Sequence, residues 1–428
     1  MDGSATATVL RNAGVPAAAM GRNGGGIERL DITIAHGRIA ALVPATGGEG
    51  RDLDGGLVLP AFADIHTHLD KGHIWPRRDN PDGTWLSALL AVHADTSRNW
   101  SARDVERRMD FALRAAHAHG TAAIRTHLDA MPPQHDVSWP VFAKMRELWA
   151  GRVELQGVSL FGPDVMLDDT QLEDVAKKTK EFGGLLGGAI HVDERSAEAL
   201  LKVVEKAGKH GLGLDLHVDE TMDPKSRALE HLADAVIATG YRGKVLAGHC
   251  CALAAQDEAT QKRTIEKVAR AGIAIVSLPL CNLYLMDRVA SGHRTPAKRG
   301  VTLVHEFRAA GVRVAIASDN TRDPFYAYGD LDGLEVLREG ARVLHFDHPQ
   351  DEAWSWARSV SADAAAIAGF AFTGEIKVGV PADLLVFRAR NWTELLSRPQ
   401  ADRQVIRNGT MIDTTLPDYR ELDDLMET

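Results

Sequence analysis

Short apolar runs alternate with longer amphipathic stretches between about residue 61 and residue 371. The runs have the length of strands, whereas stretches such as 102–119 and 261–271 place apolar residues at helical spacing. The eight runs are 61–65, 121–125, 153–160, 185–190, 212–216, 244–247, 273–280 and 312–317. Eight strand–helix units in succession predict an α/β protein built as a (β/α)8 TIM barrel.

The two ends of the chain have a different pattern. Residues 1–60 are rich in glycine and contain short β patterns, and residues 372–428 contain two more, the second of which ends in the hairpin signal Asn408-Gly409. Neither end alone could bury one face of a sheet. We therefore expect a small β-sandwich domain that combines 1–60 with 372–428 and flanks a barrel spanning 61–371.

Composition narrows the class of protein. The 428 residues are 45% hydrophobic and 25% charged, which is ordinary for a globular protein, and the net charge of -10 argues against a nucleic-acid partner. No apolar stretch is long enough to predict a membrane span. Three cysteines and no secretory signal predict a reducing compartment, the cytoplasm. We expect a homo-oligomer that acts on a small molecule.

Polar side chains gather where the runs end, and in a barrel these ends form the active-site face. They include four histidines and two carboxylates: His66, His68, His217, His249, Glu220 and Asp319. Residues two apart on a strand point to the same side, so His66 and His68 form half of a metal site. Three histidines and one carboxylate suit zinc or ferrous iron with an open position for water. Glu220 is the natural group to move protons.

Four motifs together resemble the amidohydrolase superfamily, and within it bacterial cytosine deaminase. They are His66-Thr67-His68-Leu69-Asp70, His217-Val218-Asp219-Glu220, Gly248-His249 and Ser318-Asp319-Asn320-Thr321-Arg322-Asp323-Pro324. The resemblance implies one divalent metal, Zn²⁺ or Fe²⁺, with His66, His68, His217 and Asp319 as ligands. It also implies that Glu220 shuttles protons and that His249 helps to activate the attacking water, with Asp319 sharing in catalysis.

Histidine stands where binuclear relatives carry a lysine. Run four ends at His191, so a mononuclear site is expected. The tetrapeptide His-Val-Asp-Glu occurs twice, at 191–194 and 217–220, and counting the runs places the second copy on strand five, where the ligand belongs.

Two departures bear on the substrate. Cytosine deaminases of this kind carry a glutamine just after strand three, whereas this chain has 159–163 without one, and Gln156 lies inside the run. The pairs Asp319-Asn320 and Asp70-Lys71 resemble triazine amidohydrolases that act on N-alkylammelide rings, yet those enzymes lack the glutamate that is present here as Glu220. The chain therefore combines features that resemble cytosine deaminases with features that resemble triazine amidohydrolases.

Several side chains could contact a substrate. The candidates are Trp75, Phe161 and Phe325, which follow strands one, three and eight, together with Lys71, His191 and Asn320. The three aromatic rings could sandwich a flat ring or pack at the rim. Lys71 could meet an electronegative substituent or lie on a surface loop, and His191 could face the substrate or merely pack.

We expect a metal-dependent hydrolytic deaminase of a small nitrogen heterocycle, either cytosine-like or a substituted aminopyrimidine or aminotriazine. Unsubstituted cytosine is expected to be a poor substrate, because nothing replaces the missing glutamine. One alternative is an amidohydrolase that cleaves an N-substituted amine or a cyclic amide on a similar ring. Another, from a different class, is an inactive scaffold that has kept the fold.

Overall fold

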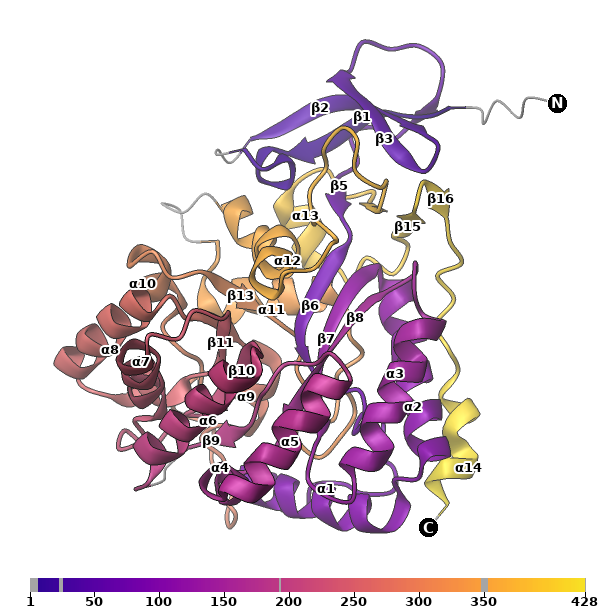
Figure 1. The fold of residues 1–428 in the computed structure, drawn as a ribbon. Helices are drawn as coiled ribbons and strands as arrows, with labels where there is room; N and C mark the ends of the chain where they lie inside the picture. Colours follow the sequence, from indigo (N-terminus) through magenta and orange to yellow (C-terminus); the bar gives the residue numbers. More distant parts are fainter. Residues whose placement is uncertain (1–6, 23–25, 192–193, 348–352, 428) are drawn as a thin grey trace.

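Two parallel sheets form the centre of the protein, which we describe from a computed structural model covering residues 7–22, 26–191, 194–347 and 353–427 (Figure 1). One sheet has the order β6-β7-β8, with β6 Phe62–Thr67, β7 Thr121–Asp129 and β8 Glu154–Leu160. The other has the order β13-β12-β11-β10-β9, with β9 Ala189–Ile190, β10 Leu214–Val218, β11 Val245–His249, β12 Ala274–Ser277 and β13 Val314–Ile316. Each predicted run overlaps one of these strands, so the α/β class is confirmed.

Isolated parallel bridges join the two sheets at both seams. Thr67 bridges to Asp319 beyond β13, while Leu185 bridges to Val158 of β8 and Leu186 bridges to Leu214 of β10. The run 185–190 is a regular strand only at its end, because Gly187 and Gly188 interrupt it and Gly188 has φ 119°, which side-chain-bearing residues rarely adopt. Because the strands within each sheet and the bridges between the sheets are all parallel, the carboxyl ends of the strands face one end of the molecule.

Helices follow the strands along the chain and surround them (Figure 1). They are α1 Trp85–Asn99, α2 Ala102–His119, α3 His135–Leu148, α4 Pro163–Leu167, α5 Asp169–Glu181, α6 Ser196–His210, α7 Ala228–Thr239, α8 Glu258–Ala271, α9 Pro279–Leu285, α10 Val304–Ala309, α11 Gly333–Leu344, α12 Ala362–Ala368, α13 Trp392–Ser397 and α14 Asp423–Met426. The predicted helix 102–119 is α2, which Ser101 caps by accepting the Asp104 N–H. Within the described ranges, no helix is long and apolar enough to cross a bilayer.

The two chain ends meet, as predicted, in one apolar cluster. One sheet has the order β3-β2-β1-β4, with β1 Thr8–Pro16, β2 Ile27–Ala35, β3 Arg38–Pro44 and β4 Arg51–Asp52. The other has the order β16-β15-β14-β5, with β5 Val58–Pro60, β14 Leu384–Val386, β15 Gln404–Arg407 and β16 Thr410–Met411. The shared cluster includes Leu10, Ile32 and Val58 from the first end and Leu384 and Ile406 from the second. Neither end of the chain forms this apolar cluster by itself.

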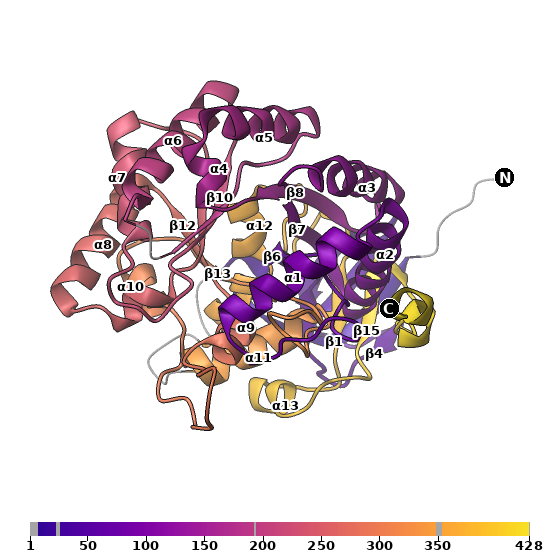
Figure 2. The same cartoon turned by 90° about the horizontal axis from the view of Figure 1, so that it is seen from below.

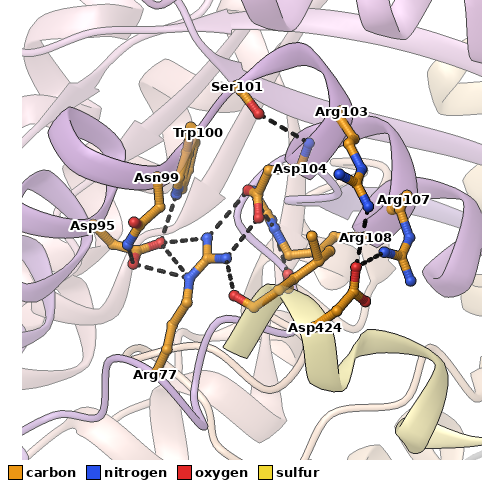
Figure 3. A network of polar contacts seen from close by, with 12 residues as sticks. Arg77, Asp95, Asn99, Trp100, Ser101, Arg103, Asp104, Arg107, Arg108 and Asp424 are labelled. Carbon is orange, nitrogen blue, oxygen red and sulfur yellow. Dashed lines mark hydrogen bonds and ion pairs between the residues drawn. The ribbon is translucent and has the colours of Figure 1, made fainter. Parts of the chain in front are cut away.

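A buried arginine ties α1, α2 and the C-terminal segment together (Figure 3). The Arg77 guanidinium donates to Asp95 on α1 at 2.8 Å and to Asp104 on α2 at 2.6 Å. It also donates to the Leu425 carbonyl at 2.9 Å. Asp104 accepts a further bond from Arg108, so each carboxylate in this network is paired. Buried charges are tolerated only when they are compensated in this way.

Arg77→Met should therefore destabilise the protein strongly. The Arg77 side chain is 1% exposed, and its loss leaves the buried Asp95 carboxylate without its cation, which costs about 3–5 kcal/mol of unfolding free energy. Arg390→Met is the control, because its pair with Glu394 is 61% and 36% exposed and should contribute little to stability. Urea unfolding compares the two, and similar losses of stability in both variants would contradict this account.

Candidate metal centre and active site

The seam between β6 and β13 places a histidine beside an aspartate. The Asp319 N–H donates to the His66 carbonyl at 2.9 Å, which joins the end of β6 to the segment after β13. Asp64, on β6, accepts bonds from the backbone N–H and the hydroxyl of Ser318. These bonds hold the Asp319 carboxylate next to the histidines that end β6.

Three imidazoles converge on this carboxylate. His217 Nε2 lies 3.1 Å from His66 Nε2 and 3.1 Å from His68 Nε2. Asp319 Oδ1 lies 3.2 Å from His68 Nε2 and 3.8 Å from His66 Nε2. An imidazole nitrogen carries either one N–H or one lone pair, so His217 Nε2 cannot satisfy both neighbouring nitrogens. A shared cation would satisfy every atom at once, and this donor set suits zinc or ferrous iron.

Burial keeps these imidazoles neutral. It lowers the pKa of His66 to about 3 and holds the pKa values of His68 and His217 well below the usual range. The positive charge of Lys71 lowers the pKa of His66 and His68 further. Burial also raises the pKa of Asp319 to about 7. Neutral imidazole is the form that binds metal, and a cation would favour the ionised carboxylate.

His249 lies at the end of β11, beside the same centre. A Cβ on the preceding residue, Gly248, would lie 2.8 Å from His66 Cε1, so only glycine lets the two strands approach here. Asn282 Nδ2 lies 3.0 Å from His249 Nδ1, a contact that orients the imidazole ring. His249 Nε2 is buried without a partner. Ligand atoms of His66, His217, His249 and Asp319 lie within 4.8 Å of one another, so position alone admits His249 as a ligand as well as His68.

Glu220 is held from both sides of its backbone. His217 lies on β10, the fifth strand, and His191 follows β9, the fourth, so the strand count is confirmed. Asp219 accepts the backbone N–H groups of Ala228 and Leu229 at the start of α7, at 2.9 and 3.0 Å. The Glu220 N–H donates to His191 Nδ1 at 3.1 Å. The loop that carries Glu220 is thus fixed between a helix start and a histidine.

The Glu220 carboxyl group has two neighbours. Trp85 Nε1 donates to its Oε2 at 2.7 Å, and its Oε1 lies 3.4 Å from His249 Nδ1. Burial, together with the nearby charge of Asp319, raises the pKa of Glu220 to about 8. A carboxyl group in this environment can carry a proton at neutral pH and donate it.

Four of the predicted substrate contacts lie around this centre. Lys71 is only 5% exposed and its Nζ lies 4.3 Å from the centroid of Phe325, so the surface-loop alternative is wrong. Asn320 Nδ2 donates to Cys281 Sγ at 3.4 Å, while its Oδ1 is buried without a partner. The His191 ring lies edge-on to Trp85, with centroids 4.8 Å apart. The structure places these side chains near the site, and their roles stay predictions.

The roles of the other two predicted contacts, Trp75 and Phe161, also stay predictions. Trp75 is half-buried, and its backbone N–H donates to the Arg322 carbonyl at 2.9 Å. Phe161 belongs to the main hydrophobic cluster, where its carbonyl accepts from the Ala189 N–H at 2.8 Å. The tryptophan that touches Glu220 is Trp85, which no motif in the sequence marks.

The side chain of Gln156 is held by hydrogen bonds in the interior of the protein. Its Oε1 accepts two bonds from the Arg125 guanidinium, at 3.0 and 2.8 Å, and Arg125 also donates to Asp215 at 2.8 Å. The side chain is therefore not free to replace the glutamine that is absent from the end of β8.

Comparisons with known proteins agree with this geometry. A model of the amidohydrolase family matches residues 112–415. A pterin deaminase from Rhizobium rhizogenes is 53% identical over 423 residues, which cover 97% of this chain and 96% of that protein.

Solved structures show the same fold. The 5-methylcytosine deaminase from Klebsiella pneumoniae, liganded with 5-fluorocytosine, has a TM-score of 0.81 at 23% identity over 96% of this chain and 98% of its own. The N-isopropylammelide isopropylaminohydrolase from Burkholderia multivorans has a TM-score of 0.74 at 25% identity over 96% of this chain and 100% of its own. The resemblance noted in the sequence is confirmed: the chain belongs to the amidohydrolase family and is a hydrolase that acts on carbon–nitrogen bonds.

Proposed function

We propose that this protein is a metal-dependent hydrolytic deaminase of an aminated bicyclic heterocycle, with a pterin ring as the first substrate to test. The observation that carries the proposal is the buried Glu220 carboxyl beside the centre of three imidazoles and Asp319. The 53% identity to a pterin deaminase over nearly the whole chain supports the choice of ring.

The residues can be assigned to the steps of a hydrolytic deamination. A cation held by His66, His68, His217 and Asp319 would lower the pKa of a water at the site toward 7 and supply a nucleophile at neutral pH. Glu220 donates a proton to the ring nitrogen beside the carbon that bears the amine, as water adds to that carbon. Asp319 and His249 hold the proton that the water gives up and return it to the amine. The carbon–nitrogen bond then breaks and ammonia leaves, while the new hydroxyl returns a proton to Glu220 and becomes the carbonyl.

The surroundings of the site favour a larger ring than cytosine. The end of β8 offers no glutamine to read a pyrimidine amide edge, and Gln156 is occupied by Arg125. The Lys71 ammonium and the unpaired Asn320 Oδ1 supply polar groups that do not come from the end of β8. A bicyclic ring with an oxo substituent near Lys71 and a second aromatic ring against Phe325 fits these groups.

The proposal extends to the architecture. We infer that strands β6 to β13 close into a (β/α)8 barrel over 61–371, which the bridges at both seams support. We also infer that 1–60 and 372–428 form a β-sandwich around their shared apolar cluster. The homo-oligomer and the cytoplasmic location stay predictions, and the three buried free cysteines support a reducing compartment.

A second candidate is hydrolysis of a substituted amine on a similar ring. Asn320 after Asp319 and the 25% identity to an N-isopropylammelide isopropylaminohydrolase favour it. Product analysis separates the two, because the first releases ammonia and the second an alkylamine. An inactive scaffold finds no support, since all four expected ligand side chains are present and converge.

Purified protein should hold about one catalytic metal per chain, and His217→Ala should lose most of it, because removing one ligand opens the donor set. His191→Ala, at the matching position of the repeated tetrapeptide, should keep the metal, since His191 contacts the Glu220 backbone instead. Elemental analysis of the three proteins checks this. Two tightly held metals per chain, or metal loss in His191→Ala, would contradict the assignment.

Glu220→Gln should keep the fold and the metal but lower turnover by at least about a hundredfold, the usual scale of general acid–base catalysis. The exposed Glu194, at the same position of the first tetrapeptide, provides the matched control Glu194→Gln. Steady-state rates and metal content are measured together. Unimpaired turnover by a metal-loaded Glu220→Gln would show that another group moves the proton.

Pterin should be deaminated at least about tenfold more efficiently than cytosine, a difference that needs only about 1.4 kcal/mol of transition-state binding. Leaving an amide edge of cytosine unpaired costs about 1–3 kcal/mol per group, which is ample for this ratio. Ammonia release from a panel of aminopteridines, aminopyrimidines and aminotriazines gives kcat/KM for each ring. A cytosine value above every other ring in the panel would overturn the substrate assignment.

A further inference from the structure

The reacting side chains are almost sealed from solvent. His66 is 0% exposed, His217 is 5% exposed and Glu220 is 6% exposed. Helix α1 lies beneath the carboxyl ends of the strands in Figure 1 and crosses that end of the molecule in Figure 2. Helix α1 is therefore one of the elements that cover the site.

Trp85, the first residue of α1, connects this helix to the catalytic acid. Its indole N–H donates to Glu220 Oε2 at 2.7 Å. Its ring lies edge-on to His191 and to Phe325, with centroids 4.8 and 6.0 Å apart. One side chain thus touches the acid and two predicted substrate contacts.

Both ends of α1 are held in place. The C-terminal half is tied down by the buried Asp95, which accepts bonds from Arg77 and Trp100 (Figure 3). The N-terminal end is held by Asn80, whose side chain donates to the carbonyls of Thr84 and Pro324 at 3.1 and 3.0 Å. Trp85 therefore approaches Glu220 from a fixed helix start.

We propose that Trp85 is a positioning residue for Glu220. The proposal rests on the deaminase function proposed above. A protonated carboxyl group has one carbonyl oxygen and one hydroxyl, and an N–H donor pairs with the carbonyl oxygen. By occupying Oε2, the indole leaves the hydroxyl on Oε1, the oxygen that lies toward His249. The acid then presents its proton to the substrate, and the indole ring closes one wall of the site.

Kinetics of two variants separate the indole N–H from the indole ring. Trp85→Phe keeps an aromatic wall but removes the donor, so kcat should fall about tenfold to a hundredfold. KM should change by less than about threefold, because binding before the chemical step is retained. Trp85→Leu removes the wall as well and should also raise KM. Metal content should match the wild type in both.

Trp149→Phe is the matched control. The Trp149 indole also donates to a carboxylate, that of Asp110 at 3.1 Å, but it does so at the end of α3. This variant loses the same type of bond and should keep the wild-type kcat. A Trp85→Phe enzyme with unchanged kcat, or a Trp149→Phe enzyme that loses as much, would overturn the role of Trp85.

A second measurement needs no turnover. In protein labelled with ¹⁵N-tryptophan, the indole signal missing from Trp85→Phe is that of Trp85. Glu220→Ala removes its acceptor and should shift this signal, while the signal assigned through Trp149→Phe should stay in place. If no heterocycle is deaminated, the proposed function fails and this shift still decides the Trp85–Glu220 contact. An unmoved Trp85 signal would overturn the positioning role whatever the enzyme turns over.

Discussion

The convergence of three imidazoles and one carboxylate on a single buried point is the constraint on which the rest of the structure depends. Neutral histidines this close cannot satisfy one another, so the arrangement persists only because rigid strand ends hold it and because a cation can complete it. His249 and Asp319 both have φ 67°, in the left-handed region that side-chain-bearing residues seldom adopt. Strain of this kind survives where the surroundings over-determine the backbone. Here Asp64 fixes the segment after β13, and Asn282 fixes the His249 ring.

Much of the fold follows from sequence periodicity. Strands buried on both faces read as continuous apolar runs, and each of the eight runs overlaps a strand. The stretch 102–119 coincides with α2 because its capping serine and terminal glycine mark both ends. The fourth strand was overestimated in length, since an apolar run does not reveal that Gly187 and Gly188 break the backbone. The Arg77 network is also invisible in sequence, because its partners come from three separate segments.

The residues of the site also differ in whether the sequence reveals them. His66, His68, His217, Glu220 and Asp319 could be found because each stands at the end of a strand-like run, and the carboxyl ends of parallel strands meet. The aromatic surroundings could be predicted only in part. Phe325 follows a strand and lies beside Lys71, whereas Trp85, which no motif marks, reaches Glu220 from the start of a helix. Where a loop side chain points depends on tertiary contacts that no local pattern encodes.

The small domain built from both chain ends has a consequence for biosynthesis. Arg38 on β3 donates to the carbonyl of Gly379, 341 positions later in the chain. At the usual rate of translation, the N-terminal strands wait roughly 15 to 70 seconds on the ribosome before their partners emerge. During that interval β5 presents an open edge, which is the kind of surface that recruits other strands. Pairing among β1, β2 and β3, which are all made early, is the part of this domain that can form before the rest of the chain is finished.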